Sequence, residues 1–172
     1  PDKIFLFPPE LLPNPFTLRG YERVLTSPSF PFVLYLRNSL FYAVLSVIGI
    51  VVSCSLVGYS FACLRWPGRD IVFVVTLATM MIPFPVVMVP LYIVFKVLGM
   101  LNSYWPLIGP NFLGTAFFIF LMRQFFKTIP LDLTEAARVD GASYASIYAR
   151  IMMPLARPVV ATTALFTFLY CW

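Results

Sequence analysis

The chain has 172 residues, of which 60% are hydrophobic and only 11% are charged. Its mean hydropathy is +0.89. A soluble domain of this size needs a far larger charged fraction to keep its surface in water, so a soluble globular protein is excluded. The aromatic content of 17% fits a protein whose rings pack against lipid and lie at the membrane interface. An integral membrane protein is therefore expected.

Neither the charged residues nor the cysteines indicate a nucleic-acid-binding protein, a metalloprotein or an enzyme. The net charge of +5 is spread over the loops and forms no basic block, so nucleic-acid binding is not expected. Histidine is absent, and Cys54, Cys63 and Cys171 lie in apolar stretches without metal-ligand spacing. No nucleophile–base pair or metal cluster is visible. We expect neither an enzyme nor a metal site.

Residues 1–37 are predicted to be an extracytoplasmic loop, because proline recurs along them. Within this loop, residues 17–25 are expected to form a short amphipathic helix with Thr17 as its N-cap. The chain opens on Pro1 and stops at Trp172 inside an apolar run, so we expect it to be truncated at both ends. The prolines are Pro8, Pro9, Pro13, Pro15, Pro28 and Pro31.

The first membrane span is predicted over residues 38–64, which contain no charged residue. A spanning helix needs about 20 apolar residues. Cys54, Gly58 and Ala62 recur at every fourth position, with Gly49 and Ser53 on a neighbouring line of the helix. Such a stripe of small residues lets a second helix approach closely in lipid.

The second uncharged stretch, residues 71–95, contains Pro83, Pro85 and Pro90. Each proline removes a backbone donor and clashes with the preceding turn, so this helix must kink or partly unwind. One interpretation is a purely structural kink. The other is that the segment lines a transport path and bends during gating.

Two further spans are predicted over residues 107–122 and from residue 158 to the end of the chain, which gives about four. The polar turn at residues 65–70 and the polar segment 123–157 carry more Lys and Arg than the loop between them, which has only Lys96. The positive-inside rule places these two richer segments in the cytoplasm.

Residues 130–154 form a polar insert between two spans and indicate a helix–turn–helix. Asp132 is expected to cap the first helix while Glu135 reaches back to it. Gly141 supplies the left-handed residue that ends this helix, and Ser143 caps the second, which runs through Ile151 to Pro154. Residue chemistry alone leaves open whether the insert is only a surface or re-entrant hairpin or a docking element for another protein.

A resemblance favours the docking element. Glu135-Ala136-Ala137, Gly141, Ile151 and Pro154 have the spacing of the EAA motif of ABC-importer permeases, and Met153 replaces the usual leucine. Further segments resemble the MalG-type carbohydrate permeases, so that the resemblance covers nearly the whole chain. They are Pro15-Phe16-Thr17-Leu18 with Tyr21, the Arg69 turn, Met81-Ile82-Pro83, Leu101-Asn102-Ser103-Tyr104, Phe125-Phe126-Lys127-Thr128-Ile129-Pro130, and Phe166-Thr167-Phe168-Leu169 with Trp172.

The resemblance implies an all-α, polytopic bundle with the type I ABC-importer permease fold, in which residues 38–172 form the truncated transmembrane domain. The segment 130–154 would be the coupling element for a cytoplasmic ATPase. Glu135, Ala136, Ala137 and Gly141 would make the contact, with Arg138 and Asp140 at its rim. Ile151 and Pro154 would anchor the element to the next span.

The implied function is that of a permease subunit in a bacterial inner membrane, carrying a sugar or related polyol. No phosphate-binding loop is present, so ATP and Mg²⁺ are expected on a partner and no cofactor on this chain. The implied partners are an ATPase dimer, a second, non-identical permease and an extracytoplasmic solute-binding protein.

Two alternatives remain open at this point: a secondary transporter or channel driven by an ion gradient, and an ABC permease for amino acids or peptides. The predicted spans lack ionisable groups, which argues against proton coupling.

Overall fold

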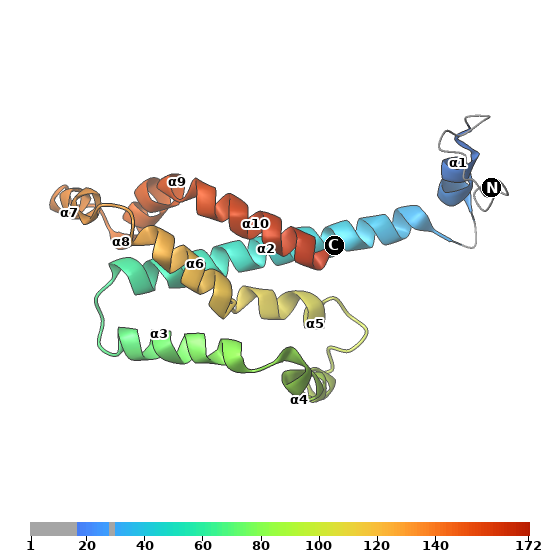
Figure 1. The fold of residues 1–172 in the computed structure, drawn as a ribbon, viewed down its shortest axis with the longest axis horizontal. Coiled ribbons are helices and arrows are strands. Elements are labelled where there is room, and N and C mark those ends of the chain that lie inside the picture. The colour runs from blue at the N-terminus through green and yellow to red at the C-terminus, as the bar shows by residue number, and fades with distance from the viewer. Residues whose placement is uncertain (1–16, 28–29) are drawn as a thin grey trace, which may run out of the picture. The chain divides into compact units, whose positions relative to one another are not determined.

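The computed structural model describes residues 17–27 and 30–172, and every element in these ranges is helical (Figure 1). This agrees with the predicted all-α class. The α-helices are α1 (Arg19–Thr26), α2 (Phe32–Cys63), α3 (Arg69–Ala78), α4 (Phe84–Val97), α5 (Trp105–Ile108), α6 (Ala116–Phe126), α7 (Leu131–Val139), α8 (Tyr144–Ile147), α9 (Met153–Leu155) and α10 (Arg157–Cys171). The shorter turns are η2 (Thr79–Met81), η3 (Gly109–Phe112) and the π-helical η4 (Tyr148–Met152).

The chain divides into two compact units, Pro1–Ser39 and Leu40–Trp172. The described part of the first unit contains α1, whose residues are all exposed. The predicted N-cap is wrong: the helix begins after Leu18, and no side chain caps it. The predicted division at residue 37 into a loop and a membrane domain stays a prediction. Pro8, Pro9, Pro13, Pro15, Phe16 and Pro28 lie outside the described residues.

In the second unit, α2 and α6 pack through the small residues foreseen in the sequence. A methyl group added to Gly58 would lie 2.7 Å from Met122 Cβ and 3.1 Å from the backbone nitrogen of Arg123. One turn earlier, the buried Cys54 sulfur accepts from the Thr115 backbone N–H at 3.3 Å. The close approach of the two helices therefore depends on side chains no larger than these.

Residues 71–95 were predicted to kink or partly unwind, and they form two helices, α3 and α4, bent by 100°. The break lies at Ile82–Pro83, where the backbone becomes extended. Pro85 stands in the first turn of α4, where proline needs no hydrogen bond, and Pro90 lies within a continuous helix. Of the three candidate prolines, only Pro83 thus sits at the bend. A gating role for any of them stays a prediction.

The other predicted spans are longer than expected or are interrupted. Helix α2 covers 32 residues, or about 48 Å. Trp105–Phe126 qualifies by length and composition as a second span, whereas α8–α9 and α10 form a second bent pair, at 77°. The described residues thus offer two to four spans, depending on whether each bent pair counts as one.

The predicted span ranges 38–64, 71–95 and 107–122 contain no charged residue, but the helices extend beyond them. As helices, these segments take in Arg37, Lys96 and Arg123, each within about two turns of a helix end. Long cationic side chains at such positions reach toward the interface or need a partner. The absence of charge from the middle of the spans therefore does not by itself exclude ion coupling.

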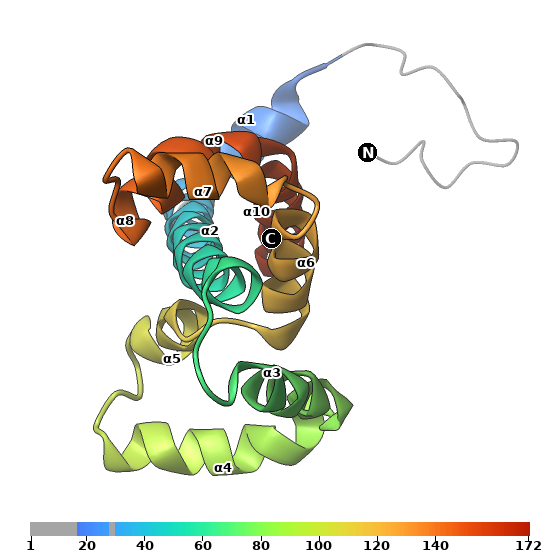
Figure 2. The ribbon, with the colours of Figure 1, turned by 90° about the vertical axis from the view of Figure 1, so that its left-hand side faces the viewer.

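Helix α4 is exposed nearly all round. Only Leu91 and Phe95 are partly covered, and none of its residues is buried. In two views α4 lies at the margin of the second unit, beyond α3 (Figures 1 and 2). A helix that is apolar on every side requires lipid or protein around it.

Candidate functional site: the polar hairpin and its supports

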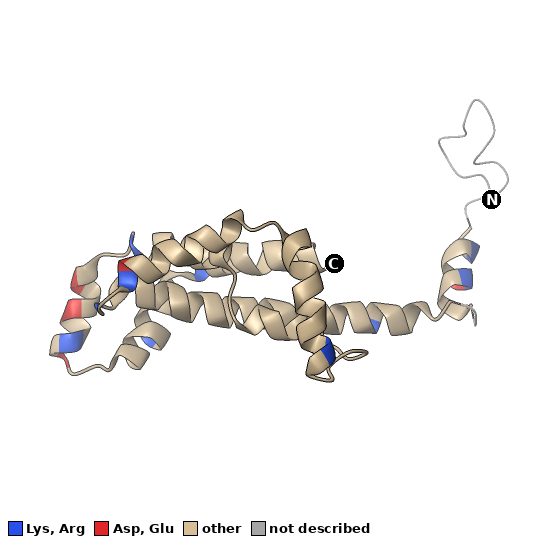
Figure 3. Ribbon diagram, turned by 90° about the horizontal axis from the view of Figure 1, so that it is seen from below, with Lys and Arg blue, Asp and Glu red and all other residues tan. Residues whose placement is uncertain are grey.

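The most polar part of the second unit is a helical hairpin of α7, a short turn and α8. Figure 3 shows charged residues gathered around α7 and the neighbouring helix ends. None of the α7 residues is buried. The predicted helix–turn–helix in segment 130–154 is therefore present.

Of the three local features predicted for the hairpin, the structure has two. Gly141 has φ +82°, the left-handed conformation expected of it, and its N–H donates to the Arg138 carbonyl at 3.0 Å. The Ser143 hydroxyl accepts from Ser146 N–H at 3.2 Å and caps α8 as predicted. The predicted capping box is wrong, since α7 begins two residues early, after Pro130, and no side chain caps it. This shift places Asp132 within the first turn, where a carboxylate favours the helix dipole without capping it.

The inner side of the hairpin is held to the helical bundle by a few contacts. Ala137 is partly buried against the core, as is Ala142, whose N–H donates to the Ala137 carbonyl at 2.9 Å. The Arg138 guanidinium lies 4.1 Å above the ring of Tyr144 on the second arm. These contacts hold the two arms together and leave the rest of α7 accessible.

A groove of about 550 Å³ lies between α7 and the end of α2. Arg65, Arg69 and Arg138 give it positive charge, which Glu135 partly offsets. Its remaining lining is apolar or uncharged: Tyr59, Ala62, Cys63, Leu131, Thr134, Tyr144 and Ile147. Of the predicted contact residues, Glu135 and Arg138 therefore face this groove, whereas Ala137 packs inward.

The opposite face of α7 carries an apolar stripe that sequence reasoning missed. Leu133 and Val139 are 45% and 88% exposed, and Ala136 between them is exposed as well. Residues three apart lie on one helix face, so these three form a continuous apolar surface on α7. The stripe could have been predicted by applying the 3.6-residue helical period to residues 131–139 alone. Asp140 and Gly141 are exposed beside this stripe.

The second arm of the hairpin contains a π-helical turn. The helix runs from α8 through η4 to α9, so it ends one residue beyond the expected Pro154. Ile151 is partly buried and Pro154 is exposed, while Met152 between them is 1% exposed. The side chain that fixes this arm in the core is thus Met152 more than Ile151. The anchoring role predicted for Ile151 and Pro154 stays a prediction.

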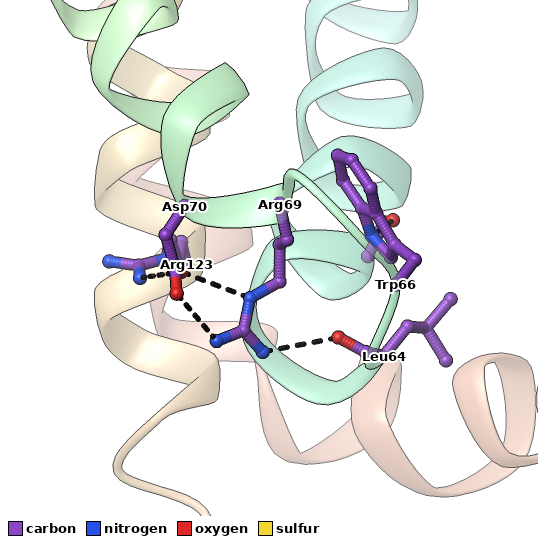
Figure 4. A network of polar contacts seen from close by, with 6 residues as sticks. Leu64, Trp66, Arg69, Asp70 and Arg123 are labelled. Atoms are coloured by element: carbon purple, nitrogen blue, oxygen red, sulfur yellow. Dashed lines mark hydrogen bonds and ion pairs between the residues drawn. The ribbon is translucent and has the colours of Figure 1, made fainter.

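A polar network beside the groove was not foreseen. Arg69 donates to the Leu64 carbonyl at the end of α2 at 3.2 Å, and its guanidinium pairs with Asp70 at 3.1 Å (Figure 4). Arg123 reaches Asp70 from α6 at 3.8 Å and lies 3.8 Å from the centroid of the Phe73 ring. The network joins the end of α2, the start of α3 and α6.

Arg123 was placed in the polar segment after the third span, but it is only 8% exposed. The α-helix continues to Phe126, and Ile119, Met122 and Phe126 bury the same side of it. Asp70 and the Phe73 ring, both from α3, are the partners of this guanidinium, whose buried Nε makes no hydrogen bond with a described residue. The sequence assigned Arg123 to a loop because charge was taken to end the span.

Arg123→Ala is expected to destabilise the protein by about 2 kcal/mol, because it removes the ring contact and leaves a buried gap between α3 and α6. Thermal unfolding of the detergent-solubilised protein measures the effect. Arg150→Ala removes an exposed arginine and is the matched control. Equal shifts in melting temperature for the two variants would contradict a supporting role for Arg123.

Among the described residues, no group of three metal-ligating side chains lies together. The three cysteines are unpaired, with Cys54 buried and the others partly buried. The fold presents a polar hairpin with an accessible apolar face, joined to apolar helices that are long enough to cross a membrane. The class is that of a helical membrane protein.

Comparison with known families gives this class its name. Residues 54–172 match the family of binding-protein-dependent transport system inner membrane components. This range covers more than half of the chain, which therefore belongs to that family. The expected family is confirmed: the chain is part of the membrane subunit of an ABC-type transporter.

Individual relatives agree. A probable ABC transporter permease protein of Pyrococcus horikoshii is 34% identical over 94% of this chain and 59% of its own length. The sn-glycerol-3-phosphate transport system permease protein UgpE of Yersinia enterocolitica is 33% identical over 99% of this chain and 62% of its own. The chain thus spans roughly three fifths of the length of these relatives.

A solved structure confirms the fold. A chain in the crystal structure of a bacterial ABC transporter involved in the import of the acidic polysaccharide alginate superposes with a TM-score of 0.80 at 30% identity. The match covers 89% of this chain and 53% of that one. The predicted ABC-importer permease fold is therefore correct.

Proposed function

We propose that this chain forms part of the path of an ATP-driven importer and couples it to a separate cytoplasmic ATPase through the hairpin α7–α8. The observation that carries the proposal is the exposed stripe Leu133, Ala136 and Val139 on a helix with no buried residue. Exposed apolar side chains on a polar helix are the usual mark of a helix that docks into a groove of another protein.

The contact surface differs in part from the residues expected from the motif. Ala136, Asp140 and Gly141 are accessible and belong to the stripe or lie beside it, whereas Glu135 and Arg138 line the groove on the other face of α7. Ala137 supports the hairpin from within. ATP and Mg²⁺ then bind the ATPase dimer, which pushes on this surface when it closes.

The solute is proposed to be a sugar or a related polyol. Relatives named for sn-glycerol-3-phosphate and for alginate handle hydroxyl-rich molecules, and nearly the whole chain aligns with them. A solute-binding protein would deliver the solute from outside, and a second permease would complete the path. The charged hairpin and the Arg65–Asp70 turn then face the cytoplasm of a bacterial inner membrane, as their positive charges favour.

Photo-crosslinking at neighbouring positions tests this proposal. A benzoyl-phenylalanine at Ala136, on the accessible face, is expected to trap an ATP-hydrolysing protein in native membranes, identified by mass spectrometry. The same probe at Ala137 is the matched control, because that side chain is partly buried against the permease itself.

The trapped protein should also be required for ATP-dependent solute uptake into proteoliposomes. Position 136 reacting only from the external side of the membrane, or uptake driven by an ion gradient without ATP, would overturn the proposal.

A further inference from the structure

The second arm of the hairpin meets the span α2 through a reciprocal pair of tyrosines. Tyr148, in the π-helical turn η4, places its hydroxyl 2.7 Å from the hydroxyl of Ser55 on α2. Ser55 is fully buried and also donates to the Val52 carbonyl at 3.1 Å. Because that donation uses the serine proton, the Tyr148 hydroxyl is the donor to Ser55.

A second contact runs in the opposite direction. Tyr59, one turn along α2 from Ser55, donates its hydroxyl to the Tyr144 carbonyl at 3.4 Å. The rings of Tyr59 and Tyr148 lie 5.3 Å apart, and Tyr59 is only 5% exposed. Thus Tyr148 of the second arm hydrogen-bonds to α2, and Tyr59 of α2 hydrogen-bonds to the second arm.

These contacts continue to the docking helix. The Arg138 guanidinium of α7 lies over the Tyr144 ring, and the backbone carbonyl of Tyr144 accepts from the Tyr59 hydroxyl. Apart from this, α7 touches the core only through partly buried residues such as Ala137. A force applied to α7 can reach the membrane helices through its link to α6, where Phe126 and Ile129 are buried, and through the arm that contains η4, where Ile147 and Met152 are each 1% exposed.

The π turn lies in the part of the arm that meets α2, and Tyr148 is its first residue. A π turn contains an additional residue and changes the direction of the side chains that follow it, and such turns occur often at functional positions. Here the turn begins at Tyr148 and includes Met152, so both a hydrogen-bonding and a buried apolar side chain of the arm meet the bundle.

We propose that Tyr148 and Ser55 are positioning residues that make α2 move with the hairpin, a role that rests on the proposed function. The tyrosine hydroxyl fixes the arm to the backbone of α2 at Val52, and the Tyr59 contact prevents the arm from pivoting about that point. Displacement of α7 by its partner then becomes displacement of the span and not bending of the hairpin.

The test uses the full-length permease, assembled with its ATPase in nanodiscs. Spin labels at the exposed Ala145 on the hairpin and Leu56 on α2, in a background without native cysteines, report the distance between the two elements by electron–electron resonance. In the unmodified protein this distance should be the same without nucleotide and with ATP plus vanadate. In Tyr148→Phe, which keeps the ring, it should broaden and shift by about 2 Å or more with ATP plus vanadate.

Matched variants separate the role of this hydroxyl from general damage. Ser55→Ala should reproduce the effect of Tyr148→Phe, and the double variant should add little, because both remove one interaction. Tyr144→Phe removes a hydroxyl that makes no hydrogen bond with a described residue, and it should behave as the unmodified protein. All variants should keep the same melting temperature within a few degrees.

The outcomes are distinguishable from failure of the proposed function. Failure of the unmodified permease to bind any ATPase would overturn the docking proposal itself. Two other results would overturn only the role of this hydrogen bond. One is that the unmodified permease binds the ATPase but its label distance changes between nucleotide states. The other is that the label distance in Tyr148→Phe does not change.

Discussion

Gly141→Pro is expected to abolish coupled transport while the protein still inserts into the membrane. Gly141 adopts φ +82°, and proline is restricted to about −65°. Proline also removes the N–H that donates to the Arg138 carbonyl at 3.0 Å. The turn must therefore open, and α7 loses its direction relative to α8. We expect ATPase binding to weaken about tenfold or more, measured by titrating the ATPase onto the reconstituted permease.

Gly141→Asn provides the control for this prediction. A Cβ at this position meets no atom within 4 Å, so only the backbone angle restricts the residue. Asparagine tolerates the left-handed conformation better than other non-glycine residues. It should retain most of the binding and transport. Equal losses in both variants would show that the side-chain space matters, which would contradict the proposed cause.

Gly58→Ala is expected to destabilise the bundle by about 1–3 kcal/mol. The added methyl would lie 2.7 Å from Met122 Cβ and 3.1 Å from the backbone nitrogen of Arg123, and neither atom is at the end of a flexible chain. Helices α2 and α6 must therefore move apart. That movement would also disturb Arg123 and its contacts with α3. Yield and melting temperature of the solubilised protein measure the loss.

Gly49→Ala, on the same helix, is the matched comparison. The three atoms nearest to its added methyl all belong to the Phe112 ring, the first at 2.8 Å, and that side chain is 46% exposed. The ring can turn away, so the substitution should cost well under half of what Gly58→Ala costs. A larger effect at Gly49 than at Gly58 would mean that the contact between α2 and α6 is not the limiting one.

The features that the sequence predicted correctly depend on local chemistry. The small residues of α2, the left-handed Gly141 and the Ser143 cap each act within a few residues or on one helix face. All three are present. The family was predicted from the spacing of the EAA motif, which no single physical rule would have identified.

The features that the sequence did not predict depend on contacts between distant segments. Arg123 was taken as the end of a span because its partners Asp70 and Phe73 lie about fifty residues earlier in the chain. Three prolines in one stretch indicated a bend but not which of them would make it. The contact between Tyr148 and Ser55 spans 93 residues, and neither residue type suggests it alone.

The groove beside the hairpin restricts how the chain can be threaded through a bilayer. Its walls come from the α2–α3 turn, with Arg65 and Arg69, and from α7, with Leu131 and Glu135. Walls of one groove share one side of the membrane. The intervening residues, 70–130, would then make an even number of crossings. This favours counting the bent pair α3–α4 as one span beside Trp105–Phe126.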